Sequence, residues 1–259
     1  MITFRDLKTL DEFAQVVELE RTVWGVGYED VVPVSLFAVT VHCGGILVGA
    51  FDGKRMVGFV YSLPGLKHGK PIQWSHMLGV VDEFRNDGLG HRLKLLQRDR
   101  ALAAGLDLIE WTYDPMQALN AHLNFSKLGI EVSEYEENIY GVSNSPLHAG
   151  NPTDRFVAEW WIRRSRKPID WTDAVPVNRI DRRNHWPQCE DVNLSERSHE
   201  LLVEIPTGFT EMLAGAPTVA FDWRMATRRI FTTYFGRGYR AVDFKLDRGA
   251  GKGVYLLAS

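Results

Sequence analysis

A run with two glycines, Arg85-Asn86-Asp87-Gly88-Leu89-Gly90, separates an apolar segment from an amphipathic one. Residues 73–81 have the pattern of a strand and residues 88–104 that of a helix. Glycine lets the backbone approach a ligand closely, and the first N–H groups of a helix have no acceptor within it. A helix N-terminus also carries positive potential, so the run predicts a pyrophosphate cradle. Arg85 would add a charged contact or cap a neighbouring loop.

Two other kinds of phosphate-binding turn do not fit this run. The dinucleotide fingerprint needs a third glycine where Leu93 stands. An ATP-binding P-loop needs a Lys-Ser/Thr pair after the glycines, and none follows. The run therefore indicates a different phosphate-containing cofactor.

The elements that must position the cradle follow from periodicity and turn residues. Asp52-Gly53 predicts a hairpin, Asp11 is the expected N-cap of the first helix, and Gly105 should end the helix after the cradle. We expect Leu89, Leu93, Leu96 and Leu102 to form much of that helix's buried stripe. Strands are expected at 2–5, 46–51, 56–63, 73–81, 106–113, 130–135 and 139–142, and helices at 10–23, 34–43, 88–104 and 117–128.

A segment rich in Ser, Asn, Pro and Gly at 143–152 predicts a boundary between a domain at 1–145 and an extension at 146–259. The extension should contain a strand at 201–205, a helix at 221–235, and strands at 241–246 and 254–257. This β-α-β-β order, and the likeness of 108–111 to 202–205, fit either a degenerate half-copy packed on the first domain or chance. A half-copy would shape the acceptor site or an interface.

The glycine run resembles the R/Q-x-x-G-x-G/A signature of the GNAT acyltransferase superfamily. A second segment, Asn120-Ala-His-Leu-Asn-Phe-Ser-Lys-Leu-Gly-Ile130, is similar to that family's N-A-x-x-x-Y-x-K-x-G-F block. The resemblance covers somewhat over half the chain, and the whole sequence is similar to a poorly characterised bacterial subgroup of larger predicted acetyltransferases. It implies an α/β fold with a mixed, mostly antiparallel sheet and flanking helices.

The resemblance also implies acetyl-CoA or another acyl-CoA as co-substrate. In this family the strand before the signature splays from its neighbour and exposes its backbone to pantetheine, and the signature amides hold the pyrophosphate. Asn120 would lie near the pantetheine arm or the leaving thiol. The implied CoA-binding residues are Leu78, Gly79, Val80, Arg85, Asn86, Asp87, Gly88, Leu89, Gly90, His91, Asn120 and Phe125.

Such enzymes usually transfer the acyl group directly to an amine, which must lose a proton before it attacks. His76 is the expected base, because alternation along residues 73–81 places it on the same face as Leu78 and Val80 and its ordinary pKa is near 6.5. Glu110 is the alternative base. A histidine that is hydrogen-bonded in the core is the competing interpretation of His76.

The sequence departs from the family at Phe125, where the usual general acid is a tyrosine. Tyr113, a water molecule or Asn124 could protonate the leaving thiolate instead. Loss of the acid also leaves open a catalytically silent CoA-binding module that regulates or binds a partner. The segment Trp111-Thr112-Tyr113-Asp114-Pro115 leaves a strand, where loops often carry function, so Trp111, Thr112, Asp114 and Asn124 are expected acceptor contacts. Asp114 would serve equally well as a helix N-cap.

The bulk composition excludes several other classes. A net charge of −3 over 259 residues does not suggest a nucleic-acid-binding protein. The only two cysteines, Cys43 and Cys189, lack the spacing of a zinc site, so no metal is expected. Without a signal peptide or an apolar run of about 20 residues, a cytoplasmic protein that does not enter membranes is predicted. The acceptor should be a small-molecule amine or amino acid; a homodimer is left open.

Overall fold

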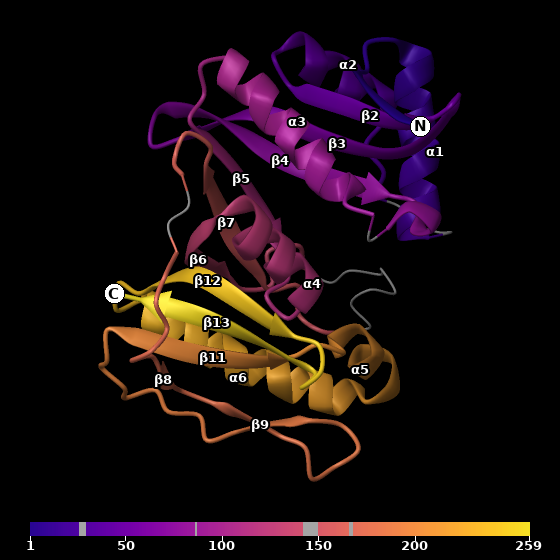
Figure 1. Cartoon of the computed structure of the whole chain (residues 1–259). Helices are drawn as coiled ribbons and strands as arrows, with labels where there is room; N and C mark the ends of the chain where they lie inside the picture. The colour runs from indigo at the N-terminus through magenta and orange to yellow at the C-terminus, as the bar shows by residue number, and fades with distance from the viewer. Residues whose placement is uncertain (26–29, 86, 142–149, 166–167) are drawn as a thin grey trace. The chain divides into compact units, whose positions relative to one another are not determined.

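The computed structural model describes residues 1–25, 30–85, 87–141, 150–165 and 168–259. The chain divides into two compact units (Figure 1). Unit 1 comprises Met1–Trp111 with Trp161–Arg164, and unit 2 comprises Thr112–Trp160 with Ser165–Ser259. The predicted domain boundary at residues 145–146 falls outside the described residues, so that division stays a prediction.

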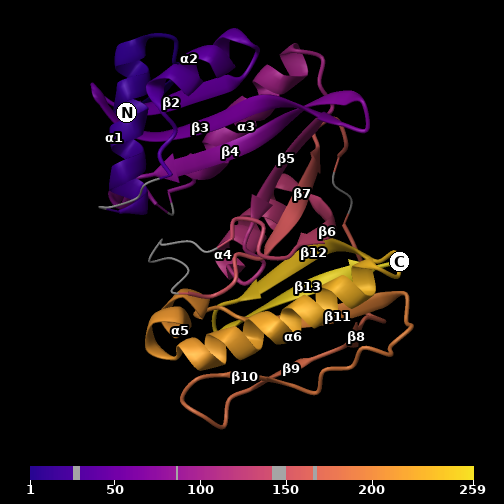
Figure 2. The same ribbon diagram turned by 180° about the vertical axis from the view of Figure 1, so that it is seen from behind.

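Unit 1 is built on a sheet of order β1-β2-β3-β4-β5. Neighbours among β1 to β4 are antiparallel, and β4 and β5 are parallel. Helices α1 and α2 cover one face of this sheet and α3 covers the other, as the opposite views in Figures 1 and 2 show. The bounds are β1 (Ile2–Asp6), α1 (Leu10–Trp24), α2 (Val34–His42), β2 (Ile46–Asp52), β3 (Arg55–Lys67), β4 (Lys70–Val80), the 3₁₀ turn η1 (Asp82–Phe84), α3 (Leu89–Ala103) and β5 (Leu108–Tyr113).

The N-cap of helix α1 lies two residues before the one that the sequence indicates. Thr9, not Asp11, is the N-cap: its side chain accepts from the Glu12 N–H, and the Glu12 carboxylate accepts from the Thr9 N–H at 3.0 Å. This reciprocal capping box satisfies two N–H groups at the helix start. Asp11 lies in the first turn instead, where its charge still favours the helix dipole.

Unit 2 contains a sheet of order β7-β6-β12-β13-β11-β8 and a separate β9–β10 pair. The predicted β-α-β-β extension is present as β11, α5 with α6, β12 and β13. Helix α6 packs on one face of β11, β13 and β12 (Figure 2). The bounds are α4 (Ala118–Ala121), the π-helix η2 (His122–Leu128), β6 (Glu131–Glu136), β7 (Arg155–Trp161), β8 (Val175–Pro176), β9 (Arg179–Asp181), β10 (Gln188–Glu190), β11 (Glu200–Pro206), α5 (Phe209–Gly215), α6 (Pro217–Phe235), β12 (Arg240–Asp247) and β13 (Lys252–Ala258).

Three expectations for unit 2 were wrong or incomplete. Residues 139 and 140 form a turn and residue 141 is irregular, so the predicted strand is not found there; residue 142 lies outside the described part. The helix predicted at 117–128 changes after one turn into a π-helix, a form often found at functional sites. The short elements α5, β8, β9 and β10 were not predicted, since none is long enough to show a periodic pattern.

Two hairpins meet at the centre of unit 2. The pair β6–β7 and the pair β12–β13 are each antiparallel, and Ala241 of β12 pairs with Val132 of β6. Both hairpins follow a helix in the chain, and β11 flanks β13 on the outside. A half-copy of the first β-α-β-β segment would produce such an order, and the repeat stays a prediction.

A buried ion pair ties α6 to the segment after β5. The Arg224 guanidinium, 1% exposed, donates from both terminal nitrogens to Asp114 at 2.7 Å each. Burial alone would raise the pKa of Asp114, but the charge and hydrogen bonds of Arg224 hold that pKa below its usual value. Asp114 also accepts from the Met116 N–H, while position 117 is the N-cap of α4. Asp114 is therefore not that N-cap, and this expectation was wrong; its carboxylate is paired with Arg224, and its contact with an acceptor stays a prediction.

Asp114→Leu should destabilise the protein by about 3–5 kcal/mol, because it leaves the Arg224 charge buried without its partner. The double variant Asp114→Leu/Arg224→Met should recover much of this loss, since it removes both buried charges. Urea unfolding of the two variants measures the difference. Glu18→Ala, which breaks the exposed Arg21–Glu18 pair, is the control and should change stability by less than about 1 kcal/mol. Equal destabilisation by the single and double variants would contradict this account.

Candidate functional site

The turn between β4 and α3 presents an uncapped helix N-terminus. Gly88 is the N-cap residue, with φ +76°, and it provides no side chain to cap the helix. The first intrahelical bond runs from the Arg92 N–H to the Gly88 carbonyl, so the N–H groups of Leu89 and Gly90 have no acceptor within α3. No acidic residue stands in the first turn to offset the dipole. These features suit an anion. Asn86, predicted to contribute here, lies outside the described residues.

The two glycines of this turn have different reasons to be glycine. Gly88 adopts a left-handed conformation that other residues rarely take. A Cβ on Gly90 would meet only Leu78 Cδ2 at 3.6 Å, an ordinary contact. Packing therefore does not require glycine at position 90, whereas close approach of a ligand would. Arg85 folds back on the turn, where its Nε donates to the Val80 carbonyl at 3.1 Å and its guanidinium pairs with Asp82.

The strand leading into the turn is only partly paired on its β5 side. The ladder between β4 and β5 in unit 1 consists of Gln73 with Ile109 and Trp74 with Glu110. After Trp74, β4 continues for six residues to Val80 while keeping its antiparallel ladder with β3. Within the described part of unit 1, the backbone of residues 76–80 therefore lacks a strand partner on one side. Open N–H and C=O groups are what an extended amide-containing ligand can pair with.

A β-bulge in β4 changes the direction of His76. Tyr61 of β3 pairs with Met77, but the next residue, Ser62, pairs with Ser75, so His76 is an extra residue. Its ring lies 6.0 Å from that of Tyr61, whose hydroxyl donates to Thr40 of α2. His76 therefore faces α1 and α2. We call this side of the sheet the α1/α2 face.

Leu78 and Val80 lie on the opposite face, the α3 face. The Leu78 side chain borders Gly90 of α3, and Val80 lies beside Leu93 of α3 around Gly58. The expectation that His76 shares a face with Leu78 and Val80 was therefore wrong. Simple alternation fails because the bulge inserts one residue, and a one-residue slip moves a side chain to the other face.

The α1/α2 face places His76 at the exposed end of a mostly aromatic cluster. Tyr61 packs edge-on against Phe37, and Trp24 packs against Phe59. His76 retains solvent-exposed surface, but partial desolvation by its neighbours lowers its pKa below 6.5. The imidazole is therefore neutral at pH 7 and can accept a proton. Gly79 also faces this side: a Cβ there would lie 2.8 Å from Phe59, so the packing requires glycine.

A buried carboxyl on the same face was not predicted as a site residue. Glu20 of α1 is 0% exposed; its Oε2 accepts from the Val32 N–H at 2.8 Å. Among the described residues Oε1 has no hydrogen-bond partner. Burial raises the pKa of Glu20 to about 7, although the Val32 N–H and the Arg21 charge oppose this. The available signal was a charge within the apolar stripe Val16–Glu20–Trp24.

Glu110, the alternative base, is already engaged. Its carboxylate is buried and forms an ion pair with Lys67. Trp111 is also buried, and the Lys94 ammonium nitrogen lies 3.6 Å from the centre of its ring. Lys94 donates to Ser75 and Gln97 on the α3 face, and burial lowers its pKa well below the usual value. Trp111 thus packs against a lysine inside unit 1.

The remaining predicted residues belong to unit 2. The buried Tyr113 hydroxyl lies beside that of Tyr255 without a well-formed hydrogen bond. Burial is the main cause that raises the pKa of Tyr113 well above 10, and the neighbouring Tyr255 hydroxyl raises it further. Thr112 shares a 2.6 Å hydrogen bond with Tyr140. Phe125 and Asn124 are buried, whereas Asn120 is exposed.

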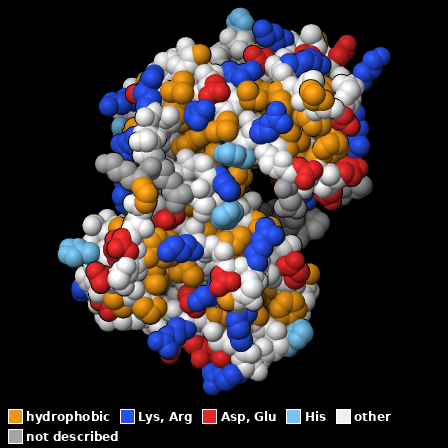
Figure 3. Space-filling model, viewed as in Figure 1, with side chains coloured by type: hydrophobic (Ala, Val, Ile, Leu, Met, Phe, Trp, Pro, Cys, Tyr) orange, Lys and Arg blue, Asp and Glu red, His pale blue; other side chains and the backbone are white. Residues whose placement is uncertain are grey.

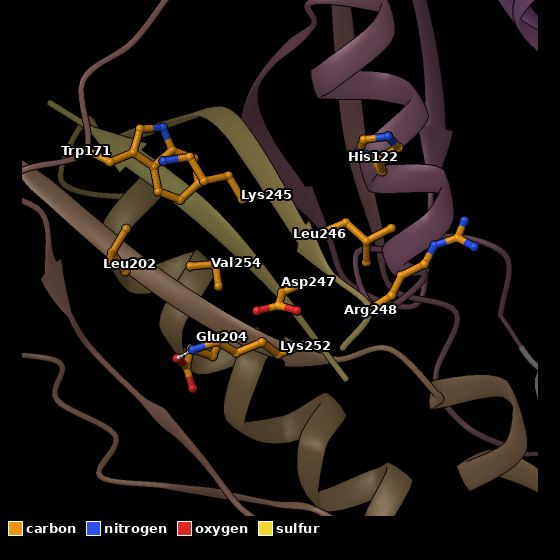
Figure 4. Close-up of a pocket in the computed structure, with 10 residues that line it drawn as sticks. All are labelled: His122, Trp171, Leu202, Glu204, Lys245, Leu246, Asp247, Arg248, Lys252 and Val254. Carbon is orange, nitrogen blue, oxygen red and sulfur yellow. Dashed lines mark hydrogen bonds and ion pairs between the residues drawn. The ribbon is translucent and has the colours of Figure 1, made fainter. Parts of the chain in front are cut away.

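Unit 2 also contains an open pocket of about 750 Å³ on the face of β11, β13 and β12 opposite α6. Two of its lysines already have partners within the protein: Lys252 pairs with Glu204 at 2.6 Å, and the Lys245 ammonium nitrogen lies 3.8 Å from the centre of the Trp171 ring (Figure 4). On this face of unit 2, cationic and acidic side chains alternate rather than gather by sign (Figure 3). Since no charge of one sign converges on the pocket, we place the candidate site at β4 and α3.

Neither a metal site nor a membrane span is found in the described part of the chain. No group of three or more His, Cys, Asp or Glu side chains there could hold an ion. The helices described are too short or too polar to cross a bilayer.

No family profile and no curated protein sequence matches the chain. Solved structures do. An acetyl-CoA complex of a Salmonella typhimurium protein assigned as an acetyltransferase has a TM-score of 0.52 at 15% identity, over 65% of this chain and 98% of that chain. The ribosomal-protein-S18-alanine N-acetyltransferase of Escherichia coli has a TM-score of 0.50 at 14% identity, over 66% and 99%. A GNAT-family acetyltransferase of Streptococcus pneumoniae has 0.50 at 17%, over 61% and 98%.

At these identities the likeness shows the fold. A whole acetyltransferase domain corresponds to less than two thirds of this chain, which agrees with the mixed, mostly antiparallel sheet and the additional C-terminal strands. The chain therefore has the fold of the GNAT acyl-CoA N-acyltransferases, as its two sequence motifs predict.

Proposed function

We propose that this protein is an acyl-CoA-dependent N-acyltransferase that moves an acetyl or other short acyl group to a primary amine of a small molecule or amino acid. The observation that carries the proposal is the uncapped N-terminus of α3, which follows, after the short turn that contains η1, a strand with an open backbone edge. The first feature suits a pyrophosphate and the second suits the amide groups of pantetheine. Their order along one chain is the order of those groups in CoA.

The residues of the turn and of β4 have separate roles in this proposal. The amides of residues 87–91 bind the pyrophosphate, and Leu78, Gly79 and Val80 contact pantetheine and the thioester. A backbone N–H of β4 polarises the thioester carbonyl, since open amides near the developing oxyanion lower its energy. Arg85 shapes the turn through Val80 and Asp82. Asn120, Asn124 and Thr112 stay proposed contacts on unit 2.

His76 is the proposed base. It faces α1 and α2, on the side opposite the helix that begins at the cradle, so amine and CoA would approach from different sides of β4. Its lowered pKa keeps the imidazole neutral and able to take a proton from the attacking amine. Glu110 is less suitable as a base because its carboxylate already forms an ion pair with Lys67.

No side chain is assigned as the general acid. Phe125 has no proton to give, and Tyr113 is buried with a pKa well above 10, which makes it a weak donor. A thiol has a pKa of about 8.5, so a thiolate can leave without prior protonation and take its proton from water. Both cysteines are free, which fits a reducing cytoplasm.

Phe125 also supports a second function, a CoA-binding module without turnover. In that case the protein binds CoA as tightly as an enzyme would, and the extension responds to it or binds a partner. Thiol release across a panel of amines and acyl-CoAs separates the two. Turnover with any amine removes the second function, and tight CoA binding without turnover favours it.

Gly90→Ala should weaken CoA binding at least about tenfold, which corresponds to about 1.4 kcal/mol. The new methyl group makes only an ordinary contact with Leu78, so the melting temperature should stay close to that of the wild type. Titration calorimetry with CoA measures the effect. Gly208→Ala is the matched control, because Gly208 precedes helix α5 and also has room for a Cβ. Unchanged CoA affinity in Gly90→Ala would remove the pyrophosphate from this turn.

His76→Ala should lower kcat by about 100-fold or more while CoA affinity stays unchanged, because only proton removal is lost. Thiol release at saturating acyl-CoA measures the rate, and calorimetry measures CoA affinity. His42→Ala, at the exposed end of α2, is the control and should keep wild-type activity. A His76→Ala enzyme with normal kcat would show that His76 is not the base.

A further inference from the structure

Glu20 has an arrangement that folding alone does not explain. It lies within the apolar stripe of α1, fully buried, with one carboxylate oxygen on the Val32 N–H and the other without a hydrogen-bond partner among the described residues. Leaving a buried acceptor unsatisfied costs stability. An amide at this position would satisfy Val32 equally well without the cost of a buried charge. A carboxyl kept under these conditions points to a use for its charge.

The neighbours of Glu20 connect it to the proposed base. Burial is the main reason that the pKa of the Tyr61 hydroxyl is raised, and the negative charge of Glu20 raises it further. Tyr61 in turn packs edge-on against His76. One turn beyond Glu20 on α1, the Trp24 ring lies over Gly79 of β4. Glu20, Tyr61 and His76 therefore share the α1/α2 face, with Glu20 at its buried end and His76 at its exposed end.

We propose that Glu20 is a specificity-determining residue of the acceptor site, whose buried carboxylate attracts positively charged amines to the α1/α2 face in preference to neutral molecules of the same shape. This inference rests on the proposed function for the position of the acceptor. Glu20 does not have to touch the amine, because the attraction between charges in a poorly solvated site acts over several ångströms.

The proton balance of the transfer is consistent with this role. The amine arrives as an ammonium ion, and Glu20 stabilises it in that form. His76 takes the first proton, which frees the nitrogen lone pair to form the C–N bond as the C–S bond breaks. The second nitrogen proton is lost to solvent, and the thiolate takes up a proton from water. Glu20 gains and loses no atom, so it is a positioning residue for the cation.

The titratable groups around Glu20 determine how pH affects it. Among the described residues these are Arg21 on its own helix and Tyr61 on β3, and His76 on β4 packs against the far side of Tyr61; α2 contributes the uncharged Thr40. Tyr61 stays neutral near neutral pH, because its pKa is raised from 10. Glu20, with a pKa of about 7, gains its negative charge between about pH 6 and 8. Deprotonation of His76 lies lower, because its pKa is below 6.5.

The test compares amines with alcohols of the same shape, benzylamine with benzyl alcohol and butylamine with butanol, binding to the full chain saturated with CoA. At pH 8, Glu20→Gln should weaken binding of the amines at least about tenfold and leave the alcohols unchanged. Glutamine keeps an oxygen for the Val32 N–H, so the fold of α1 should persist. Glu18→Gln, exposed on the same helix, is the matched control and should bind both like the wild type.

Two measurements on the same proteins keep the inference open to contradiction. In the wild type, the preference for amine over alcohol should rise from pH 6 to pH 8. In Glu20→Gln this preference should not rise at pH values above those at which His76 loses its proton. The raised pKa also means that native Glu20 holds its proton more tightly than the unfolded chain does, so its stability contribution falls as pH rises from about 4.5 to about 7. Glu20→Gln should therefore have a higher melting temperature than the wild type at pH 8 and the same melting temperature at pH 5.

The outcomes separate this inference from the proposed function. Equal loss of amine and alcohol binding would make Glu20 structural, and no loss of either would give its charge no role; both contradict the inference. A wild type that binds no amine in preference to its alcohol contradicts it without any variant. Absence of CoA binding or of thiol release with every amine would instead contradict the proposed function.

Discussion

One extra residue in β4 determines what the candidate site can do. The bulge at His76 reverses the alternation of side chains within a strand that is otherwise regularly paired with β3. Upstream, Ser75 reaches Lys94 on the α3 face; downstream, Leu78 and Val80 point to the same face. His76 and Gly79 are left on the α1/α2 face. A strand without the bulge could not present a base on one side and keep Leu78 against the cradle helix on the other.

Two kinds of buried charge occur among the described residues. Asp114 and Arg224 form a bidentate pair with matching geometry, so each offsets the desolvation of the other, and removing one partner is costly. Glu20 accepts from a backbone N–H, and Lys94 donates to the neutral side chains of Ser75 and Gln97. Their pKa values move toward the neutral forms, as burial dictates. The first kind holds α6 in unit 2; the second lies on the two faces of the strand that carries the candidate site.

Sequence patterns predicted the elements of unit 1 and the cradle, because glycine spacing and long apolar periods are local signals. They could not predict the direction of His76, since a bulge depends on the register with β3 and leaves no mark in the β4 sequence. Burial on α3 was also only partly predicted: Leu89 and Leu93 are buried, but Lys94 and Gln97 occupy positions expected for Leu96 and Leu102. Tertiary contacts with Ser75 and Trp111 explain this. The N-cap role expected for Asp114 was wrong, because its carboxylate pairs with Arg224, which stands 110 residues away.

The extension gives a physical reason for phenylalanine at position 125. The Phe125 side chain is 0% exposed and its ring lies 5.7 Å from that of Tyr255 in β13. The next residue, Ser126, donates to the Phe244 carbonyl of β12. The π-helix is thus packed against strands that a shorter acyltransferase would lack. The Tyr255 hydroxyl already donates to the Pro115 carbonyl. A tyrosine at 125 would bring one more hydroxyl into this core, and burying it unpaired would cost about 1–3 kcal/mol. Phenylalanine avoids that cost, so the position has become part of the unit 2 core, and proton transfer in the proposed reaction depends on unit 1 and solvent.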